Sequence, residues 1–148
     1  MRKTNVVITG ASSGLGAGMA RALGALFLAA DGTQLIDGGA ALAELASIDL
    51  AGLDPRLQQT EITVACDVDN PLCGPRGASA VFGPQKGATP QIVAELDAAL
   101  ANFALCAQQA SGRDVAGLPG AGAAGGLGAG LMFFTPAQLR PGVDIVLD

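Results

Sequence analysis

The residues best suited to chemistry lie in one stretch, 61–88, with the sequence EITVACDVDNPLCGPRGASAVFGPQKGA. Its alternating apolar residues predict a buried strand, and a polar turn with Asp67, Asp69 and Asn70 follows that strand. A glycine-rich loop then leads to Lys86. Carboxylates at the C-terminal end of a strand, with a lysine nearby, indicate a site for a charged ligand. The simpler interpretation is an Asx-type turn and a surface lysine.

A second candidate is the turn TGASSGLG at residues 9–16, between a β-branched strand at 5–8 and a helical pattern at 15–28. Glycines and a free helix N-terminus allow backbone N–H groups to approach a phosphate. Ser12 and Ser13 are candidates to contact that phosphate, and helix capping is the alternative role. The pattern TGxxxGxG resembles the nucleotide-binding turn of short-chain dehydrogenases. That family's Tyr-x-x-x-Lys pair is absent, because the chain contains no tyrosine.

The third candidate is the small-residue run at 118–132, which continues into two phenylalanines without a charge. Gly120, Gly122 and Gly125 could bring N–H groups to a phosphate. Close helix packing explains them equally well, since a glycine inside a helix costs roughly 1 kcal/mol and needs a reason. We expect a helix entered through PGAGAAGG, followed by a final strand at 143–147 after Pro-Gly.

Composition excludes several classes of function. Histidine is absent, which rules out Ser-His-Asp chemistry, and three unpaired-looking cysteines predict reduced thiols rather than a zinc site. The net charge is -5 with scattered basic residues, so we expect no nucleic-acid binding. No apolar run reaches the roughly 20 residues of a membrane span, and we expect a cytoplasmic protein. A chain of 148 residues suits a single domain over 1–148.

The clearest predicted helix runs from Pro90 to about residue 109 and stops by Gly112, with Thr89 as its cap. Its expected apolar face is formed by Ile92, Leu96, Leu100 and Phe103. Leu105 is also expected in the core, whereas Glu95 and Asp97 are expected in solvent. A shorter helical pattern covers 40–46. Residues 48–57 predict a loop in which Asp54 caps a turn of helix at Pro55.

Five blocks together resemble glycerate kinases of the bacterial glycerate 2-kinase type. They are AGMARALGA (17–25), IDLAGLDPRL (48–57), VACDVDNPL (64–72), FGPQKGA (82–88) and PGAGAAGG (119–126). The resemblance implies an α/β fold, a compact layered domain with a central sheet flanked by helices. It also implies ATP-dependent phosphorylation of D-glycerate with Mg²⁺. Asp67, Asp69 and Asn70 would be the catalytic residues, with Asp67 holding Mg²⁺ or orienting the hydroxyl. Lys86 and the glycines would meet phosphate.

The resemblance covers the middle of such a kinase, its inserted domain, so we expect the opposite wall of the cleft to come from elsewhere. The chain by itself should then be weakly active or inactive, and exposed apolar surface should promote self-association or docking of a second domain. The turn at 9–16 departs from the family's Gly-Gly-Ser-x-Thr-Asn-Asp-Gly-Gly pattern. The alternatives are a non-catalytic nucleotide- or metabolite-binding domain and, third, a dehydrogenase-like NAD(P)-binding fragment.

Overall fold

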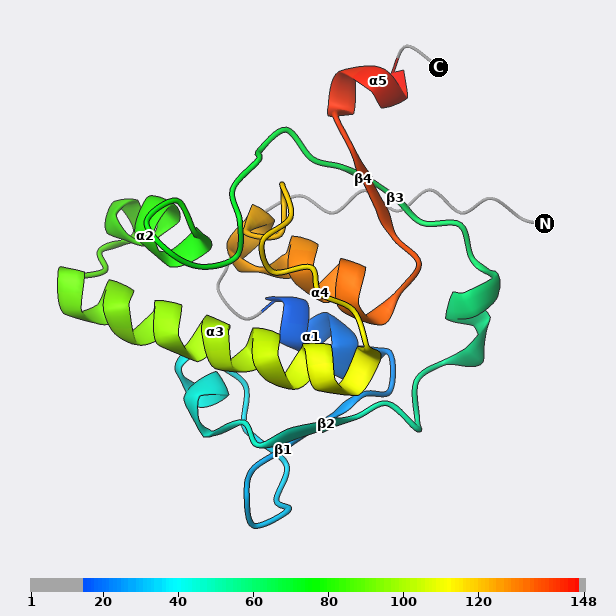
Figure 1. The fold of residues 1–148 in the computed structure, drawn as a ribbon, viewed down its shortest axis with the longest axis horizontal. Coiled ribbons are helices and arrows are strands. Elements are labelled where there is room, and N and C mark those ends of the chain that lie inside the picture. The colour runs from blue at the N-terminus through cyan, green and yellow to red at the C-terminus, as the bar shows by residue number, and fades with distance from the viewer. Residues whose placement is uncertain (1–14, 147–148) are drawn as a thin grey trace.

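A computed structural model describes residues 15–146, in which three of the four strands precede the long run of helices that contains α2, α3 and α4 (Figure 1). The α-helices are α1 (Leu15–Ala22), α2 (Ala78–Phe82), α3 (Pro90–Ser111), α4 (Leu127–Phe134) and α5 (Gly142–Val146). The strands are β1 (Leu26–Leu28), β2 (Ser47–Asp49), β3 (Thr63–Ala65) and β4 (Gln138–Arg140). Short 3₁₀ helices are η1 (Ala40–Glu44), η2 (Pro55–Gln59), η3 (Pro84–Lys86) and η4 (Ala123–Gly125). The predicted α/β class is confirmed.

In the part of the chain that the structure describes, the strands form two separate two-stranded sheets rather than one central sheet. β1 and β2 are antiparallel, with Leu26 opposite Asp49. β3 and β4 are parallel, with Ala65 opposite Arg140. Figure 1 shows the helices α1, α3 and α4 between these two pairs. Strands of three residues bury too little surface to organise a domain, so the helices supply the centre.

The core is an aromatic cluster made by one strand and two helices. Phe27 of β1, Phe103 of α3, and Phe133 and Phe134 of α4 are all at most 2% exposed. The Phe27 and Phe103 rings stack with centroids 6.1 Å apart, and Phe133 meets Phe103 edge-on at 5.9 Å. Aromatic pairs at such distances contribute roughly 0.5–1.5 kcal/mol beyond the burial of their area. This cluster joins α3, α4 and the first sheet.

Helix α3 has the ends that its sequence predicts. The hydroxyl of Thr89 accepts a hydrogen bond from the Ile92 amide, and Gly112 closes the helix with φ +71°. The predicted apolar face is only partly right, because Ile92 is 42% exposed, and the predicted burial of Leu105 is wrong, because it is 54% exposed. Leu105 lies two residues after Phe103, which turns it about 200° around the helix and away from the core.

The pattern at 15–28 is a helix only as far as Ala22. Gly24 then adopts φ +104°, and a β-carbon there would lie 2.0 Å from the carbonyl oxygen of Gly52. The chain therefore reverses into β1, and the expected continuous helix is wrong. Residues 48–57 likewise include the end of β2 as well as η2, whose predicted cap is confirmed by Asp54 accepting from the Arg56 amide.

The glycine run leads into α4 as predicted, and it packs closely. A β-carbon at Gly128 would lie 2.0 Å from the carbonyl oxygen of Gly120. The final strand predicted at 143–147 is wrong: the strand is β4, and Gly142–Val146 is helical. The alternating apolar pattern there is too short to separate the two periods. No helix among residues 15–146 has the length and apolarity to cross a membrane.

Candidate functional site

An open hollow lies where the C-terminal ends of β3 and β4 meet the loop before α4. Its volume is about 340 Å³, and it is lined by Cys66, Asp67, Val68, Asp69, Pro119, Leu139, Arg140 and Pro141. Figure 1 shows β3 and β4 crossing beside this loop, above the helical layer. Since both strands are parallel, their carboxyl ends present the following side chains on the same edge. The structure thus brings Asp67 and Asp69 together, as the sequence predicts.

The strand before this turn is less buried than its apolar pattern predicts. Ile62, Val64 and Cys66 are all only partly buried. The Cys66 thiol donates to the carbonyl of Val68 at 3.3 Å, within the turn itself. A partly exposed strand end leaves its neighbouring polar groups accessible from the hollow, which suits a ligand site better than a sealed core strand.

Asp67 connects the two strand ends that form the hollow. Its Oδ1 accepts a hydrogen bond from the Gly142 amide at 2.7 Å. The carboxylate therefore fixes the start of α5 with one oxygen. A second oxygen on the same exposed side chain remains for a ligand hydroxyl or a cation.

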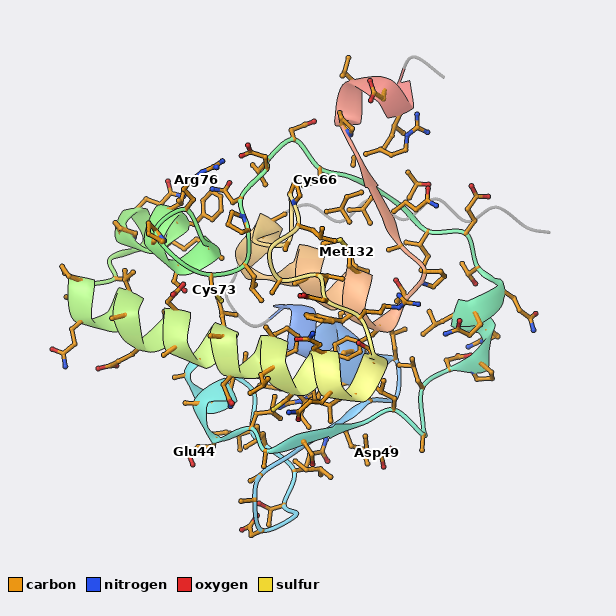
Figure 2. The ribbon with its side chains drawn as sticks, in the orientation of Figure 1. Glu44, Asp49, Cys66, Cys73, Arg76 and Met132 are labelled. Atoms are coloured by element: carbon orange, nitrogen blue, oxygen red, sulfur yellow. The ribbon has the colours of Figure 1, made fainter. Side chains whose placement is uncertain are left out.

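Asp69 and Asn70 both engage Arg76, a residue for which the sequence analysis had no role. A guanidinium nitrogen of Arg76 lies 3.1 Å from Asp69 Oδ2, and both side chains are at least 70% exposed. Asn70 Nδ2 donates to the Arg76 carbonyl at 2.8 Å, and the Asn70 carbonyl accepts from the Gly122 amide at 2.9 Å. Asn70 thus fixes the shape of the turn. Figure 2 shows Arg76 beside α2.

The predicted phosphate-binding glycines pack against this turn. Gly120 has φ +84°, and a β-carbon there would lie 3.1 Å from Cys66 Sγ. A β-carbon at Gly122 would lie 2.3 Å from the Pro71 carbonyl oxygen. Gly125 has φ +68° in η4. Close packing is therefore observed at Gly120 and Gly122. A phosphate role remains a prediction, and at Gly122 it requires the N–H to leave the Asn70 carbonyl.

The structure does not bring Lys86 to the hollow. Lys86 is exposed on η3 and does not line the hollow. Figure 1 places α2 and the start of α3 at the left, well away from the crossing of β3 and β4. Ser12 and Ser13, with the strand predicted at 5–8, lie outside the described residues. Their phosphate-binding roles stay predictions.

Asp97 is a structural anchor that the sequence analysis placed in solvent. Both of its carboxylate oxygens lie 3.1 Å from the Gly74 amide nitrogen. Burial, and next the negative charge of Asp97, raise the pKa of the neighbouring Cys73 thiol from 9.0 to about 11. The thiol is therefore protonated at neutral pH and is a poor nucleophile. Asp97 follows Leu96 of the apolar stripe of α3, and this position beside the stripe could have indicated that its carboxylate is partly buried.

Arg140 also had no role predicted from the sequence, and it lines the hollow. A local pattern does mark Arg140, because it stands at the end of an apolar segment directly before Pro141 and Gly142. Asp67 follows the end of its own strand in a similar way. Recognising Arg140 as part of the hollow required the parallel pairing of β3 with β4, which no local pattern specifies. Distant strand pairing is the part of a site that periodicity alone does not give.

Residues 15–146 contain no group of three His, Cys, Asp or Glu side chains that could hold a metal ion. This does not conflict with magnesium, which keeps several waters and is often held by one or two carboxylates and by substrate phosphates. Asp67 and Asp69 fit that donor set. The three cysteines are free, as expected, so the site has no disulfide.

The hollow of this α/β chain thus combines two carboxylates and an arginine at the ends of paired strands. Comparisons with known proteins identify the family of the chain. The model of the glycerate kinase family matches residues 3–148, and the chain belongs to this family. The family is one of kinases, and thus of transferases. The match includes the glycine turn at 9–16, so the dehydrogenase-like alternative gains no support.

The similarity extends over most of the chain. The chain is 54% identical to a glycerate kinase of Halalkalibacterium halodurans over 133 residues, which are 90% of this chain and 35% of that protein. It is 49% identical to the glycerate 2-kinase of Escherichia coli (strain K12) over 146 residues, 97% of this chain and 38% of that one. The chain spans about a third of the length of these relatives.

The fold is similar as well. A crystal structure assigned to glycerate kinase 2 from Salmonella typhimurium LT2 superposes with a TM-score of 0.88 at 54% identity. The overlap covers 92% of this chain and 36% of that one. The α/β arrangement around the hollow is therefore that of a glycerate kinase structure.

Proposed function

We propose that this chain acts in the ATP-dependent phosphorylation of D-glycerate and that the hollow after β3 binds the glycerate. The observation that carries the proposal is the pair Asp67 and Asp69 at a strand end, lining one hollow, in a chain of the glycerate kinase family. Phosphoryl transfer needs positioning and neutralisation of charge more than covalent chemistry. Exposed carboxylates, which accept hydrogen bonds and bind magnesium, suit that task.

Each predicted residue has a separate role in this proposal. Asp67 orients the reacting hydroxyl or holds Mg²⁺, because its Gly142 contact fixes its position. Asp69 contributes the second carboxylate. Asn70 keeps the turn in shape through its contacts with Arg76 and Gly122. Magnesium, when bound, would neutralise the phosphates of the nucleotide.

The remaining expectations belong to the same proposal. Lys86, Gly125, Ser12 and Ser13 are proposed to contact the phosphates of the nucleotide. A cytoplasmic location and one domain over 1–148 are proposed as well. Association through exposed apolar side chains such as Ile36, which is 79% exposed, would complete the surface with a second domain or a second copy.

A titration of the labelled 148-residue chain with D-glycerate, followed by nuclear magnetic resonance, tests the proposal. We expect saturable shifts at the amides of residues 66–70, 138–140 and 142. When Mg²⁺ and ATP are added, we expect at most slow formation of phosphoglycerate in the ³¹P spectrum, because the opposite wall of the cleft is expected to come from elsewhere. Asp67→Asn should weaken D-glycerate binding at least tenfold, because a hydrogen bond to a charged group contributes roughly 1.5–3 kcal/mol.

The matched control is Asp49→Asn. Asp49 is also an exposed aspartate in a local turn, where it accepts from the Ala51 amide, and it does not line the hollow. Its variant should bind D-glycerate as the unchanged chain does. Failure of the unchanged chain to bind D-glycerate contradicts the proposal. Binding of nucleotide alone would instead favour the non-catalytic binding domain, which the family membership does not favour.

A further inference from the structure

The hollow contains one basic side chain whose role nothing above assigns. Of the described residues that line it, only Arg140 is basic, and its side chain is partly buried. The others are Asp67, Asp69 and apolar or small groups. A hollow with carboxylates and a guanidinium offers two different kinds of contact, one for hydroxyls or cations and one for an anion.

The backbone that directly follows the Arg140 side chain is fixed against the acidic turn. The Arg140 carbonyl accepts from the Cys66 amide at 2.8 Å, which continues the β3–β4 pairing. Two residues later, the Gly142 amide donates to Asp67 at 2.7 Å. The Arg140 side chain therefore starts directly before two hydrogen bonds to the segment Cys66–Asp67, so that the backbone carrying Arg140 and the backbone carrying Asp67 are held together.

D-Glycerate carries a carboxylate at one end and two hydroxyls. Its carboxylate is repelled by Asp67 and Asp69, because like charges at contact distance destabilise each other. A guanidinium accepts a carboxylate in a planar fork of two hydrogen bonds, which also fixes its orientation. With the carboxylate on Arg140, the hydroxyl end of the same molecule is directed toward the aspartates of this 340 Å³ hollow.

We propose that Arg140 is the residue that binds the substrate carboxylate, and that it makes the hollow select 2-hydroxy carboxylates over uncharged polyols. This inference rests on the proposed function and names the group that would give it specificity. Arg76 is not assigned this role, because it does not line the hollow.

The test compares D-glycerate with D-glyceramide, in which an uncharged amide replaces the carboxylate. The full chain, Arg140→Gln, Arg140→Lys and Arg56→Gln are titrated with each compound. Arg56 serves as the charge-matched control, since it pairs with Asp54 on η2, away from the lining residues. Arg140→Gln should bind D-glycerate at least tenfold more weakly and D-glyceramide unchanged. Arg140→Lys should lose less, because a lysine offers a point charge without the fork.

A second measurement uses the unchanged chain, so its result does not depend on whether a variant folds. The Nε–H signal of Arg140 should shift with D-glycerate and stay in place with D-glyceramide. Equal binding of D-glycerate by the unchanged chain and Arg140→Gln would overturn the inference and leave the proposed function standing. A loss in Arg140→Gln confined to MgATP would overturn it too, because the guanidinium would then serve a phosphate. No D-glycerate binding by the unchanged chain would overturn both.

Discussion

The aromatic core and the hollow are built in opposite ways. In the core, side chains fill the space: Phe27, Phe103, Phe133 and Phe134 meet ring against ring, each at most 2% exposed. Around the hollow, backbone meets backbone. Gly122 lies so close to Pro71 that a β-carbon would be 2.3 Å from its carbonyl oxygen.

The difference shows what each region can tolerate. A core of large side chains loses stability when atoms are removed, since a cavity remains. A junction of glycines loses stability when atoms are added, since nothing can move aside but backbone. The hollow keeps its polar side chains exposed and relies on this rigid support. Packed side chains in the core therefore stabilise the fold, and close backbone contacts at the glycines position the acidic turn.

The largest expected effect is Phe103→Ala. Phe103 contacts the rings of Phe27, Phe133 and Phe134, so its removal should cost roughly 3–5 kcal/mol in the free energy of unfolding. Chemical denaturation measures the loss. The control is Leu105→Ala on the same helix, where the side chain is 54% exposed and the change should stay near 0.5 kcal/mol. Equal losses would mean that α3 faces the core differently from this structure.

Next is Gly122→Ala, which tests the other region by adding one methyl group. The contact with Pro71 and the hydrogen bond from the Gly122 amide to Asn70 cannot both survive, and we expect a loss of about 3 kcal/mol. D-Glycerate binding should fall as well, because Asn70 shapes the acidic turn. Gly117→Ala is the control, since no heavy atom lies within 4 Å of its β-carbon position. A harmless Gly122→Ala would remove the distinction between the two regions.

The two regions also differ in how much of them the sequence predicts. Thr89, Pro90 and Gly112 mark the ends of α3, because capping and left-handed closure depend on a few neighbouring residues. The acidic turn after β3 is local too, and Asp67 and Asp69 lie together as expected. These features follow from short-range chemistry.

Other features depend on contacts between distant residues. The pairing of β3 with β4 brings Arg140 to the hollow from the far end of the chain. The helix predicted at 15–28 ends early, and Gly24 packs against Gly52, whose carbonyl oxygen lies 2.0 Å from the β-carbon position of Gly24. The Asp97 carboxylate accepts a hydrogen bond from the Gly74 amide instead of facing solvent. No window of sequence contains both partners, so periodicity could not give these contacts.

The link between the two regions predicts a pH effect. Cys73 and Asp97 tie α3 to the loop that follows the acidic turn, and the pKa of Cys73 rises from 9.0 to about 11 through burial and the nearby carboxylate. The folded chain keeps a thiol proton that the unfolded chain releases. Stability should therefore be full below about pH 9 and fall between pH 9 and 11.

Denaturation at several pH values measures this slope. The thiol is only partly buried, so the loss should be less than the full linkage of about 1.4 kcal/mol per pKa unit. Cys73→Ala should abolish the contribution, and Asp97→Asn should reduce it, since one of the two causes of the shift is removed. An unchanged slope in Cys73→Ala would assign the alkaline loss to other groups.

The smallest effect concerns Ala124 in η4, which has φ 51° and ψ 42°. A left-handed alanine is strained by roughly 1–2 kcal/mol, and glycine relieves that strain at some cost in the entropy of the unfolded chain. Ala124→Gly should thus raise the free energy of unfolding by about 0.5–1 kcal/mol. The control is Ala129→Gly in α4, a buried position where the same change should cost about 1 kcal/mol. A gain in the free energy of unfolding at Ala124 and a loss at Ala129, for removal of the same methyl group, would show that the glycine run and the packed helix differ as described. A loss at both positions would show that the Ala124 methyl contributes packing that outweighs its strain, and that side-chain packing extends into the glycine run.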